Sequence, residues 1–275
     1  MVKLVFVDMD GTFLTSEKTI TSENARILDV AYEHGVQFVP CSGRNMRDLP
    51  QELVNHPSVH YAVCCNGALI VEARSREVMR EITIDKSLVR ELYETARDLR
   101  VTFDIFADGR VYTERSRFPL IDTVGLSAPT RAFIKAGRTV FDGPMDDLLD
   151  RVGGICRLNV FYHTIEERNR IWEAVDACSD LRRTNSLPCN IEITNVHAHK
   201  GAGAEWLCEK LGLSPLDAIA FGDNDNDITM LQAVGDGVAM ENADPVCKAA
   251  ANHLTESCEN SGVARYLAPI FKVRL

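Results

Sequence analysis

Short apolar runs that alternate with helical segments constrain this chain more than any other feature of its sequence. The runs have the length and content of buried strands, and they lie at 4–7, 36–41, 61–65, 218–221 and 237–240. One helical segment follows Thr21 and ends at Gly35, and another runs from Lys200 to Leu211 and stops at Gly212. Strands that alternate with helices predict a parallel sheet, so we expect an α/β fold with a Rossmann-like core.

The middle of the chain has a different pattern, which is typical of antiparallel hairpins packed with helices. Its strand candidates are 81–84, 101–106, 110–113, 156–162 and 190–194, and Asp108-Gly109 is a hairpin signal between two of them. Two helices are expected, one over 85–99 and one from a capping box that starts at Thr164. We therefore predict an α+β unit inserted at 84–189, with 1–83 and 190–275 forming the core.

Charge and composition exclude several classes of protein. The 275 residues carry 40 acidic and 30 basic side chains, which gives a formal net charge of −10. Nucleic acid and anionic membranes both require basic surface, so neither is expected as a partner. The N-terminal apolar run is too short for a signal segment, and no run approaches the ~20 residues of a membrane span. Nine cysteines without a CxxC motif indicate reduced core thiols, and the expected location is cytoplasmic.

Polar clusters follow the predicted core strands directly. Segment 8–12 reads Asp-Met-Asp-Gly-Thr after the first strand, and Ser42-Gly43-Arg44 follows the second. Lys200 opens a helix, and the acidic segment 222–227 follows a late strand. Because ligands bind at the carboxyl ends of the strands in open parallel sheets, these clusters should converge on one site.

Asp8 and Asp10 are the candidates for the chemical step. Residues i and i+2 of an extended segment face the same side, so both carboxylates can reach one substrate. A carboxylate nucleophile that attacks phosphorus would explain why acidic groups lie in a phosphate site, but it requires a cation to neutralise the charge. The alternative is a strand that ends in an ordinary Asp-Gly turn.

The acidic segment after the late strand can hold that cation. Asp223 and Asp227 lie in a run of hard oxygen ligands that suits Mg²⁺. An EF-hand is excluded because Ile228 occupies its sixth position, where glycine is needed, and Val234 its twelfth, where glutamate is needed. The alternative is a polar loop whose side chains cap a helix that begins near Ile228.

Ser42, Arg44 and Lys200 are the candidates for phosphate binding. A hydroxyl and main-chain N–H groups that follow a strand can donate to phosphate oxygens, and a helix start favours an anion near Lys200. Taken alone, Ser42 is also explained by turn chemistry, and Lys200 and Arg44 are better explained as solvated cations. Their joint position at strand ends favours the functional interpretation. His197 and His199 could form a metal-binding pair, but no third soft ligand lies near them in the sequence. P-loop, GxGxxG and GxSxG motifs are absent from the sequence.

The four clusters, in this order, resemble the motifs of the haloacid dehalogenase superfamily, and more narrowly those of its Cof-type phosphatases. The four motifs correspond to residues 8–12, 42–44, 200–201 and 222–231, and further likeness lies at 238–243 and 262–264. The resemblance implies a haloacid-dehalogenase-like core with a large α/β cap between the second and third motifs, and it places substrate specificity in that cap. Ser42 stands where relatives often have Thr, which preserves the hydroxyl.

The resemblance also implies a role for each matching residue. Asp8 would be the nucleophile that forms an aspartyl-phosphate, and Asp10 would act as acid and then as base. Mg²⁺ would be held by Asp8, the main-chain carbonyl of Asp10 and Asp223, with Asp227 in support. The phosphoryl oxygens would be bound by Ser42, Gly43, Lys200 and Asn226, and Arg44 would contact the substrate.

We therefore expect a Mg²⁺-dependent phosphatase of a small phosphorylated metabolite, with a sugar phosphate as the substrate class. One alternative is a phosphomannomutase-like phosphotransferase, which needs a second phosphate site in the cap. Another is a non-catalytic protein that binds a phosphometabolite. The cap arginines are expected to be solvated surface cations, and they are Arg115, Arg117, Arg157, Arg182 and Arg183.

Overall fold

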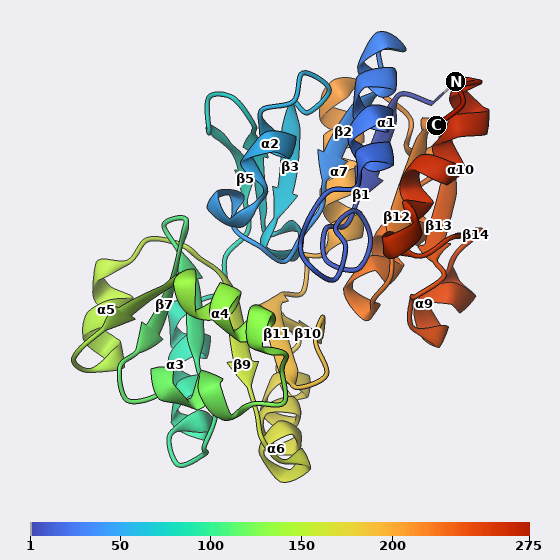
Figure 1. Ribbon diagram of the computed structural model, residues 1–275. Coiled ribbons are helices and arrows are strands. Elements are labelled where there is room, and N and C mark those ends of the chain that lie inside the picture. Colours follow the sequence, from blue (N-terminus) through green and yellow to red (C-terminus); the bar gives the residue numbers. More distant parts are fainter. Residues whose placement is uncertain (1) are drawn as a thin grey trace. The chain divides into compact units, whose positions relative to one another are not determined.

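The computed structural model describes residues 2–275 and divides into two compact units. The first unit consists of the N-terminal segment through Arg80 together with His199–Leu275, and the second unit is Glu81–Ala198. In Figure 1 the first unit combines the blue and red ends of the chain, whereas the second is coloured green to yellow. No helix within residues 2–275 is long and apolar enough to cross a membrane.

A five-stranded parallel sheet forms the centre of the first unit, with the strand order β14-β13-β12-β1-β2. The strands are β1 (Leu4–Val7), β2 (Gln37–Pro40), β12 (Ala218–Gly222), β13 (Asp236–Met240) and β14 (His253–Thr255). β1 lies between β2 and β12, so Val5 is opposite Phe38 on one side and Ile219 on the other. All four residues of β1 are buried, as expected for a strand covered on both faces. The predicted α/β core is confirmed.

Helices cover both faces of this sheet. Figure 1 shows α1 (Ser22–Glu33) and α10 (Gly262–Phe271) in front of the sheet and α7 (Lys200–Leu211) behind it. The hydroxyl of Thr21 caps α1 by accepting the N–H of Asn24 at 3.2 Å. Gly212 ends α7 in the left-handed conformation that glycine adopts readily. The shorter helices are α2 (Gln51–Val54), α8 (Ile228–Ala233) and α9 (Pro245–Ala250).

A small three-stranded sheet follows β2 in the chain. It contains β3 (Tyr61–Cys64), β4 (Leu69–Glu72) and β5 (Val78–Glu81). A parallel bridge between Cys41 and Val63 connects β3 to the end of β2. The strand expected at 81–84 is therefore wrong in position, because β5 ends at Glu81 and Ile84 makes only an isolated bridge to Ile155.

The second unit is an α+β unit built on a six-stranded sheet with the order β10-β11-β9-β6-β7-β8. Its strands are β6 (Asp104–Ala107), β7 (Arg110–Glu114), β8 (Arg138–Phe141), β9 (Ile155–Phe161), β10 (Leu181–Thr184) and β11 (Asn190–Asn195). Its helices are α3 (Lys86–Ala96), α4 (Ala128–Ala136), α5 (Met145–Arg151) and α6 (Ile165–Asp176). The predicted capping box at Thr164 is present, since its hydroxyl and the Glu167 carboxylate satisfy each other's backbone N–H groups.

Six short 3₁₀ segments complete the chain, and they are η1 (Met46–Asp48), η2 (Cys65–Gly67), η3 (Phe118–Thr123), η4 (Pro215–Asp217), η5 (Asp225–Asp227) and η6 (Cys258–Asn260) within residues 2–275. Two expectations about the second unit differ from the structure. Only two helices were predicted, whereas the unit has four, of which α4 and α5 are short at nine and seven residues. The predicted boundaries of 84 and 189 also differ from the observed 81 and 198, since β11 pairs with β9 and β10 of the second unit.

Arg117 is a buried cation that satisfies the carboxyl end of α3. Its guanidinium donates to the carbonyls of Val101 at 2.8 Å, Leu99 at 3.2 Å, and Ala96 and Arg97 at 3.0 Å each. The last carbonyls of a helix have no partner within the helix, so this side chain replaces the missing donors. The expectation that Arg117 is a solvated cation is therefore wrong, and it is wrong for Arg157 too, which is buried and paired with Glu192.

Replacement of Arg117 by methionine removes four donors and leaves buried carbonyls without partners. We expect Arg117→Met to lower the free energy of unfolding by about 2–4 kcal/mol, measured as a shift of the urea midpoint. Arg115→Met is the matched control, because Arg115 is exposed and pairs only with exposed Asp142. It should change the free energy by no more than about 0.5 kcal/mol. Equal midpoints for the two variants would contradict the capping role.

Candidate active site

The predicted site residues lie where the parallel strands of the first unit end. Asp8 directly follows β1, Cys41 and Ser42 follow β2, and Asp223 follows β12. The backbone keeps these ends in register, since Cys41 donates its N–H to Val7 at 2.8 Å and Asp8 donates its N–H to Phe221 at 3.0 Å. The expected convergence of the first, second and fourth clusters at one sheet edge thus follows from the strand order.

Lys200 provides the buried cation of this edge. Its ammonium donates to Asp8 Oδ1 and to Asp227 Oδ1, each at 2.6 Å, and its side chain is 0% exposed. Burial alone would lower the pKa of Lys200, but the attraction of Asp227 and Asp8 outweighs it and raises that pKa. Lys200 therefore stays positively charged and joins segments that are 192 residues apart.

Asp227 fixes the loop that carries Asp223. One oxygen of Asp227 accepts from Lys200, and the other accepts the backbone N–H groups of Asp223 at 3.0 Å and Asn224 at 3.1 Å. The alternative interpretation, in which this segment caps the helix that begins near Ile228, is wrong for Asp227, which makes no side-chain cap hydrogen bond at the start of α8. Its carboxylate instead closes a capping box with Asn224 at the start of η5. Its second role, toward Lys200, is not a capping role.

Three buried carboxylates gather around this ammonium. Oxygens of Asp8, Asp223 and Asp227 lie within 4.8 Å of one another. Burial raises the pKa of Asp8 to about 7; Lys200 opposes that rise and Asp227 adds to it. Burial and the charges of Asp8 and Asp227 raise the pKa of Asp223 as well. The hydroxyl of Thr12, which donates to Asp223 at 2.8 Å, opposes this rise. When ionised, three carboxylates against one ammonium leave an excess of two negative charges.

This excess of negative charge indicates whether a divalent cation fits the cluster. A doubly charged ion would neutralise the cluster, and its hard oxygen donors are those that Mg²⁺ prefers. Gly11 leaves room for the side chain of Asp223. Its φ is +87°, and a Cβ added to it would lie 2.4 Å from Asp223 Oδ2. The residues present therefore fit such a cation.

Asp10 has surroundings opposite to those of Asp8. Its carboxylate makes a two-pronged contact with Arg44, whose Nε lies 2.7 Å from Oδ2 and whose Nη2 lies 2.6 Å from Oδ1. Lys18 Nζ lies 2.7 Å from the same Oδ1. Burial would raise the pKa of Asp10, but Arg44 and Lys18 together hold it below its ordinary value. Asp10 is thus a carboxylate paired with two cations.

Lys18 is a site residue that the sequence analysis missed. It lies in a tight turn between Leu14 and Ile20, which form an antiparallel bridge. Its φ of +63° is in the left-handed region that non-glycine residues rarely adopt. No local pattern marks this lysine, because only the closed turn brings it to Asp10.

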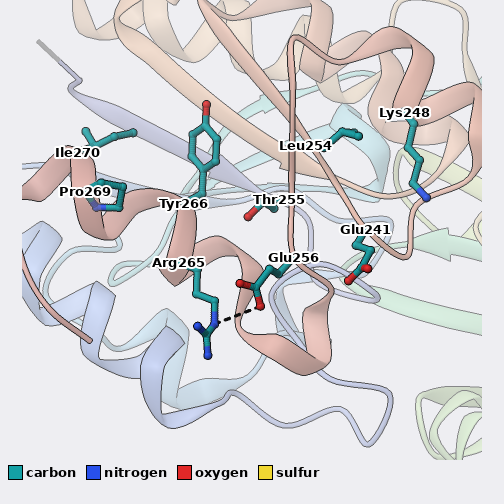
Figure 2. A pocket seen from close by; sticks show the side chains of 9 residues that line it. All are labelled: Glu241, Lys248, Leu254, Thr255, Glu256, Arg265, Tyr266, Pro269 and Ile270. Atoms are coloured by element: carbon teal, nitrogen blue, oxygen red, sulfur yellow. Dashed lines mark ion pairs between the residues drawn. The ribbon is translucent and has the colours of Figure 1, made fainter.

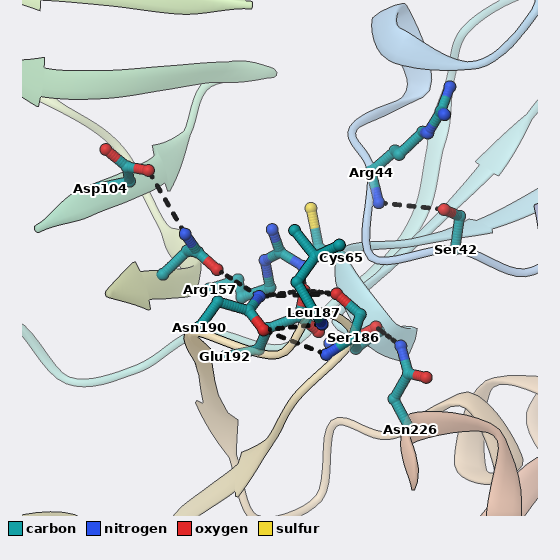
Figure 3. A network of polar contacts seen from close by, with 12 residues as sticks. Ser42, Arg44, Cys65, Asp104, Arg157, Ser186, Leu187, Asn190, Glu192 and Asn226 are labelled. Carbon is teal, nitrogen blue, oxygen red and sulfur yellow. Dashed lines mark hydrogen bonds and ion pairs between the residues drawn. The ribbon is translucent and has the colours of Figure 1, made fainter. Parts of the chain in front are cut away.

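The phosphate candidates after β2 lie in one turn with Arg44. The hydroxyl of Ser42 accepts the backbone N–H of Arg44 at 3.2 Å, with Gly43 between them. Asn226 donates from Nδ2 to Asn66 Oδ1 at 3.2 Å, as Figure 3 shows. Asn66 was also missed, although Asn66-Gly67 after β3 is a turn signal. Its φ of +56° is one that asparagine tolerates.

A separate surface cavity of about 670 Å³ lies beside β14 and α10. Figure 2 shows an ion pair between Arg265 and Glu256 at 3.4 Å among its lining side chains, with Leu254, Pro269 and Ile270 as apolar walls. None of the predicted site residues lines it. It is therefore distinct from the acidic cluster at the sheet edge.

Comparisons with known proteins agree with this geometry. A family model described as haloacid dehalogenase-like hydrolase matches residues 5–267. The protein YxeH of Bacillus subtilis is 29% identical over 272 residues, which cover 96% of each chain. The 5-amino-6-(5-phospho-D-ribitylamino)uracil phosphatase YcsE of the same organism is 27% identical, over 96% of this chain and 94% of its own.

The fold is shared with a solved structure. A haloacid dehalogenase-like hydrolase from B. subtilis superimposes with a TM-score of 0.86 at 24% identity, over 100% of both chains. The resemblance expected from the four motifs is confirmed by the family match and the curated relatives. The chain therefore belongs to the haloacid dehalogenase-like hydrolase family, in which it is a phosphoric monoester hydrolase.

Proposed function

We propose that this protein is a Mg²⁺-dependent phosphatase that hydrolyses a small phosphorylated metabolite through an aspartyl-phosphate on Asp8. The observation that carries the proposal is the buried cluster around Lys200, in which the Asp8 carboxylate is held by an ammonium within an excess of two negative charges. A protein that only binds phosphate has no use for buried carboxylates that repel the ligand.

The first step joins Asp8 to phosphorus. An oxygen of the Asp8 carboxylate attacks the phosphoryl group, the bond from phosphorus to the ester oxygen breaks, and the leaving alkoxide takes a proton from Asp10. In the second step a water gives its proton to Asp10 and attacks phosphorus. The bond from phosphorus to Asp8 then breaks, and inorganic phosphate leaves with the Asp8 carboxylate restored.

Asp10 must be protonated before it can act as the acid. In the structure its two cationic partners favour the ionised form. We propose that Arg44 binds the substrate as well as Asp10, because a guanidinium binds phosphoryl oxygens in the same two-pronged way as it binds a carboxylate. When Arg44 turns to the phosphoryl group, Asp10 loses its strongest partner and takes up a proton more readily.

The phosphoryl oxygens need donors at the sheet edge. The hydroxyl of Ser42, the backbone at Gly43, the ammonium of Lys200 and the amide of Asn226 are assigned to them. Asp8, the main-chain carbonyl of Asp10, and Asp223 are assigned to Mg²⁺, with Asp227 supporting them from behind through Lys200 and the backbone. When bound, the ion supplies positive charge that offsets the negative charge on the transferred phosphoryl group.

The proposed substrate class is a sugar or polyol phosphate. Support comes from the relative YcsE, which is named for a substrate with a phosphorylated ribityl chain. The second unit is proposed to be the cap that selects among such substrates. The cytoplasm is the proposed location, because all nine cysteines are free thiols, as is usual in a reducing compartment.

The central test measures phosphate release from a panel of sugar and polyol phosphates. Asp8→Asn nearly preserves size but removes the nucleophile, so kcat should fall by about 10³-fold or more, and EDTA should abolish turnover of the natural protein. Asp98→Asn, at an exposed position of the second unit, is the control and should keep full activity. Unchanged turnover in Asp8→Asn would place the nucleophile elsewhere. Transfer of labelled phosphate to a second sugar without phosphate release would establish the phosphotransferase alternative.

Lys200→Met tests the buried cation. Removal of the ammonium leaves Asp8 and Asp227 buried without their partner, so the free energy of unfolding should fall by about 3–5 kcal/mol at pH 8. The loss should be smaller at pH 6, where Asp8 can take up a proton. Lys210→Met, in the exposed last turn of α7, is the control. Its urea midpoint should equal that of the natural protein. A loss that is the same at both pH values would contradict the charge argument.

Metal affinity should depend on pH through Asp8. The pKa of Asp8 near 7 means that a proton competes with the cation below neutrality. The apparent Kd for Mg²⁺, measured by calorimetry, should therefore rise by at least about tenfold for each pH unit below 7. Asp8→Asn should remove most of this dependence. A Kd that is flat between pH 5.5 and 8, values chosen to bracket that pKa, would exclude Asp8 as the competing group.

A further inference from the structure

A turn after β3 contacts the second and fourth polar clusters of the first unit and the residue that precedes the third. It consists of Cys65, Asn66 and Gly67, and we call it the 65–67 turn. Their φ angles of +51°, +56° and +93° are all in the left-handed region. Successive residues of this kind, two of them not glycine, are costly and persist only where their surroundings hold them. The contacts of the 65–67 turn therefore indicate its role.

The backbone of the 65–67 turn holds the segment that carries Ser42 and Arg44. Cys65 donates its N–H to the carbonyl of Arg44, and Asn66 donates its N–H to the carbonyl of Ser42, both at 3.0 Å. Ser42 in turn donates its own N–H to Val63 at 2.9 Å. The N–H and the carbonyl of Ser42 are thus both engaged, so the backbone that carries its hydroxyl is fixed.

Gly67 brings the 65–67 turn against the start of α7. A Cβ added to Gly67 would lie 2.2 Å from the carbonyl oxygen of His199, so a side chain there would force the backbone to shift. His199 directly precedes Lys200, and its Nδ1 accepts the N–H of Ala202 as the cap of α7. The 65–67 turn is therefore held in place by the helix that carries the buried ammonium.

The side chain of Asn66 reaches the fourth cluster. Its Oδ1 accepts from Nδ2 of Asn226 at 3.2 Å, and the two residues are 160 positions apart in the chain. Both are buried, with exposed fractions of 3% for Asn66 and 6% for Asn226. The amide nitrogen of Asn226 carries two hydrogens, of which Asn66 accepts one. Because the amide group is planar, this bond also sets the direction of the other hydrogen.

The need for a turn does not by itself explain an asparagine at position 66. The 65–67 turn joins β3 to β4, and a left-handed backbone is all that such a connection requires. Glycine supplies that backbone at no steric cost. The bond to Asn226 is a feature that turn chemistry does not provide, so the side chain of Asn66 has a role beyond the conformation of the turn.

We propose that Asn66 is a positioning residue for phosphoryl binding, which holds the amide of Asn226 so that its second N–H donates to a phosphoryl oxygen. Asn66 acts through Asn226 and does not itself touch the ligand. The inference rests on the proposed function in one respect, namely that Ser42 and Asn226 bind the phosphoryl group. It adds that these two donors are linked, since the N–H of Asn66 holds the backbone of Ser42 and its side chain holds Asn226.

The test is a double-mutant cycle, read as the Kd for inorganic phosphate measured by calorimetry with Mg²⁺ present. Asn66→Gly removes the side chain but permits the left-handed backbone and keeps the N–H to Ser42. It should weaken phosphate binding by about tenfold. Asn226→Ala should weaken it by about tenfold as well. Because the side chain of Asn66 acts only through Asn226, the double variant should match Asn226→Ala within about twofold.

Ser261→Gly is the matched control. Ser261 is also buried, has the same φ of +56° and donates its hydroxyl to Thr21 at 2.7 Å. It precedes α10 and is outside the set of residues assigned to the phosphoryl group. Both glycine variants should lower the melting temperature by no more than about 6 °C. Only Asn66→Gly should change the Kd for phosphate by more than about twofold.

A second measurement requires no change at Asn66. The two Nδ2 hydrogens of Asn226, identified by the loss of their NMR signals in Asn226→Ala, should give separate signals in the natural protein. When phosphate is added, the hydrogen that is bonded to Asn66 should keep its chemical shift, and the other should move. Movement of both signals to the same extent, or of neither, would contradict the proposed orientation of the amide.

Four outcomes of the cycle would overturn the inference. The first is a Kd that Asn66→Gly leaves unchanged, and the second is a double variant that binds phosphate about a hundredfold more weakly than the natural protein, as independent residues would. The third is an equal loss in Ser261→Gly, and the fourth is a natural protein that does not bind millimolar phosphate. Failure of the proposed function is distinguishable, because it would show as turnover that survives Asp8→Asn while the cycle remains non-additive.

Discussion

The burial of one ammonium, that of Lys200, is the interaction on which the catalytic unit depends. A fully buried cation is tolerated only when carboxylates accompany it, and here the two carboxylates come from the end of β1 and from the loop after β12. Asp227 in turn holds the backbone of Asp223 and Asn224. Correct assembly of the sheet and correct assembly of the site are therefore one event, because neither charge can be buried before its partner arrives from a distant part of the chain.

Asp8 and Asp10 are two residues apart, yet their surroundings move their pKa values in opposite directions. Asp8 lies among buried carboxylates, which together with burial raise its pKa to about 7, whereas Arg44 and Lys18 lower that of Asp10. Carboxylates with separated pKa values are suited to different steps of one reaction. In the proposed reaction, Asp8 carries its charge while the cation is bound, and Asp10 takes up its proton once Arg44 turns to the phosphoryl group.

Local and long-range features differed in how well the sequence predicted them. The bounds of β1 and α7, the caps at Thr21 and Gly212 and the clusters at the strand ends were predictable, because each depends on neighbours a few residues away. Lys18, Asn66 and the buried ion pairs of the second unit were not. Lys18 reaches Asp10 through a turn with a left-handed residue, and the ion pairs join different strands, such as Arg157 on β9 with Glu192 on β11. Arg117 and Arg157 were misjudged for the same reason, since their burial depends on tertiary contacts that no local pattern records.

The two units solve different electrostatic problems, and this difference bears on how substrate choice could change. The first unit concentrates charge and must keep its buried ammonium, carboxylates and added cation in balance, so replacement of any one charge disturbs the others. In the second unit Arg138 pairs with buried Asp104 and Arg157 pairs with buried Glu192, so these charges already balance within that unit. If this unit selects the substrate, as proposed, substitutions in it can alter that choice without changing the charge at the site of phosphoryl transfer.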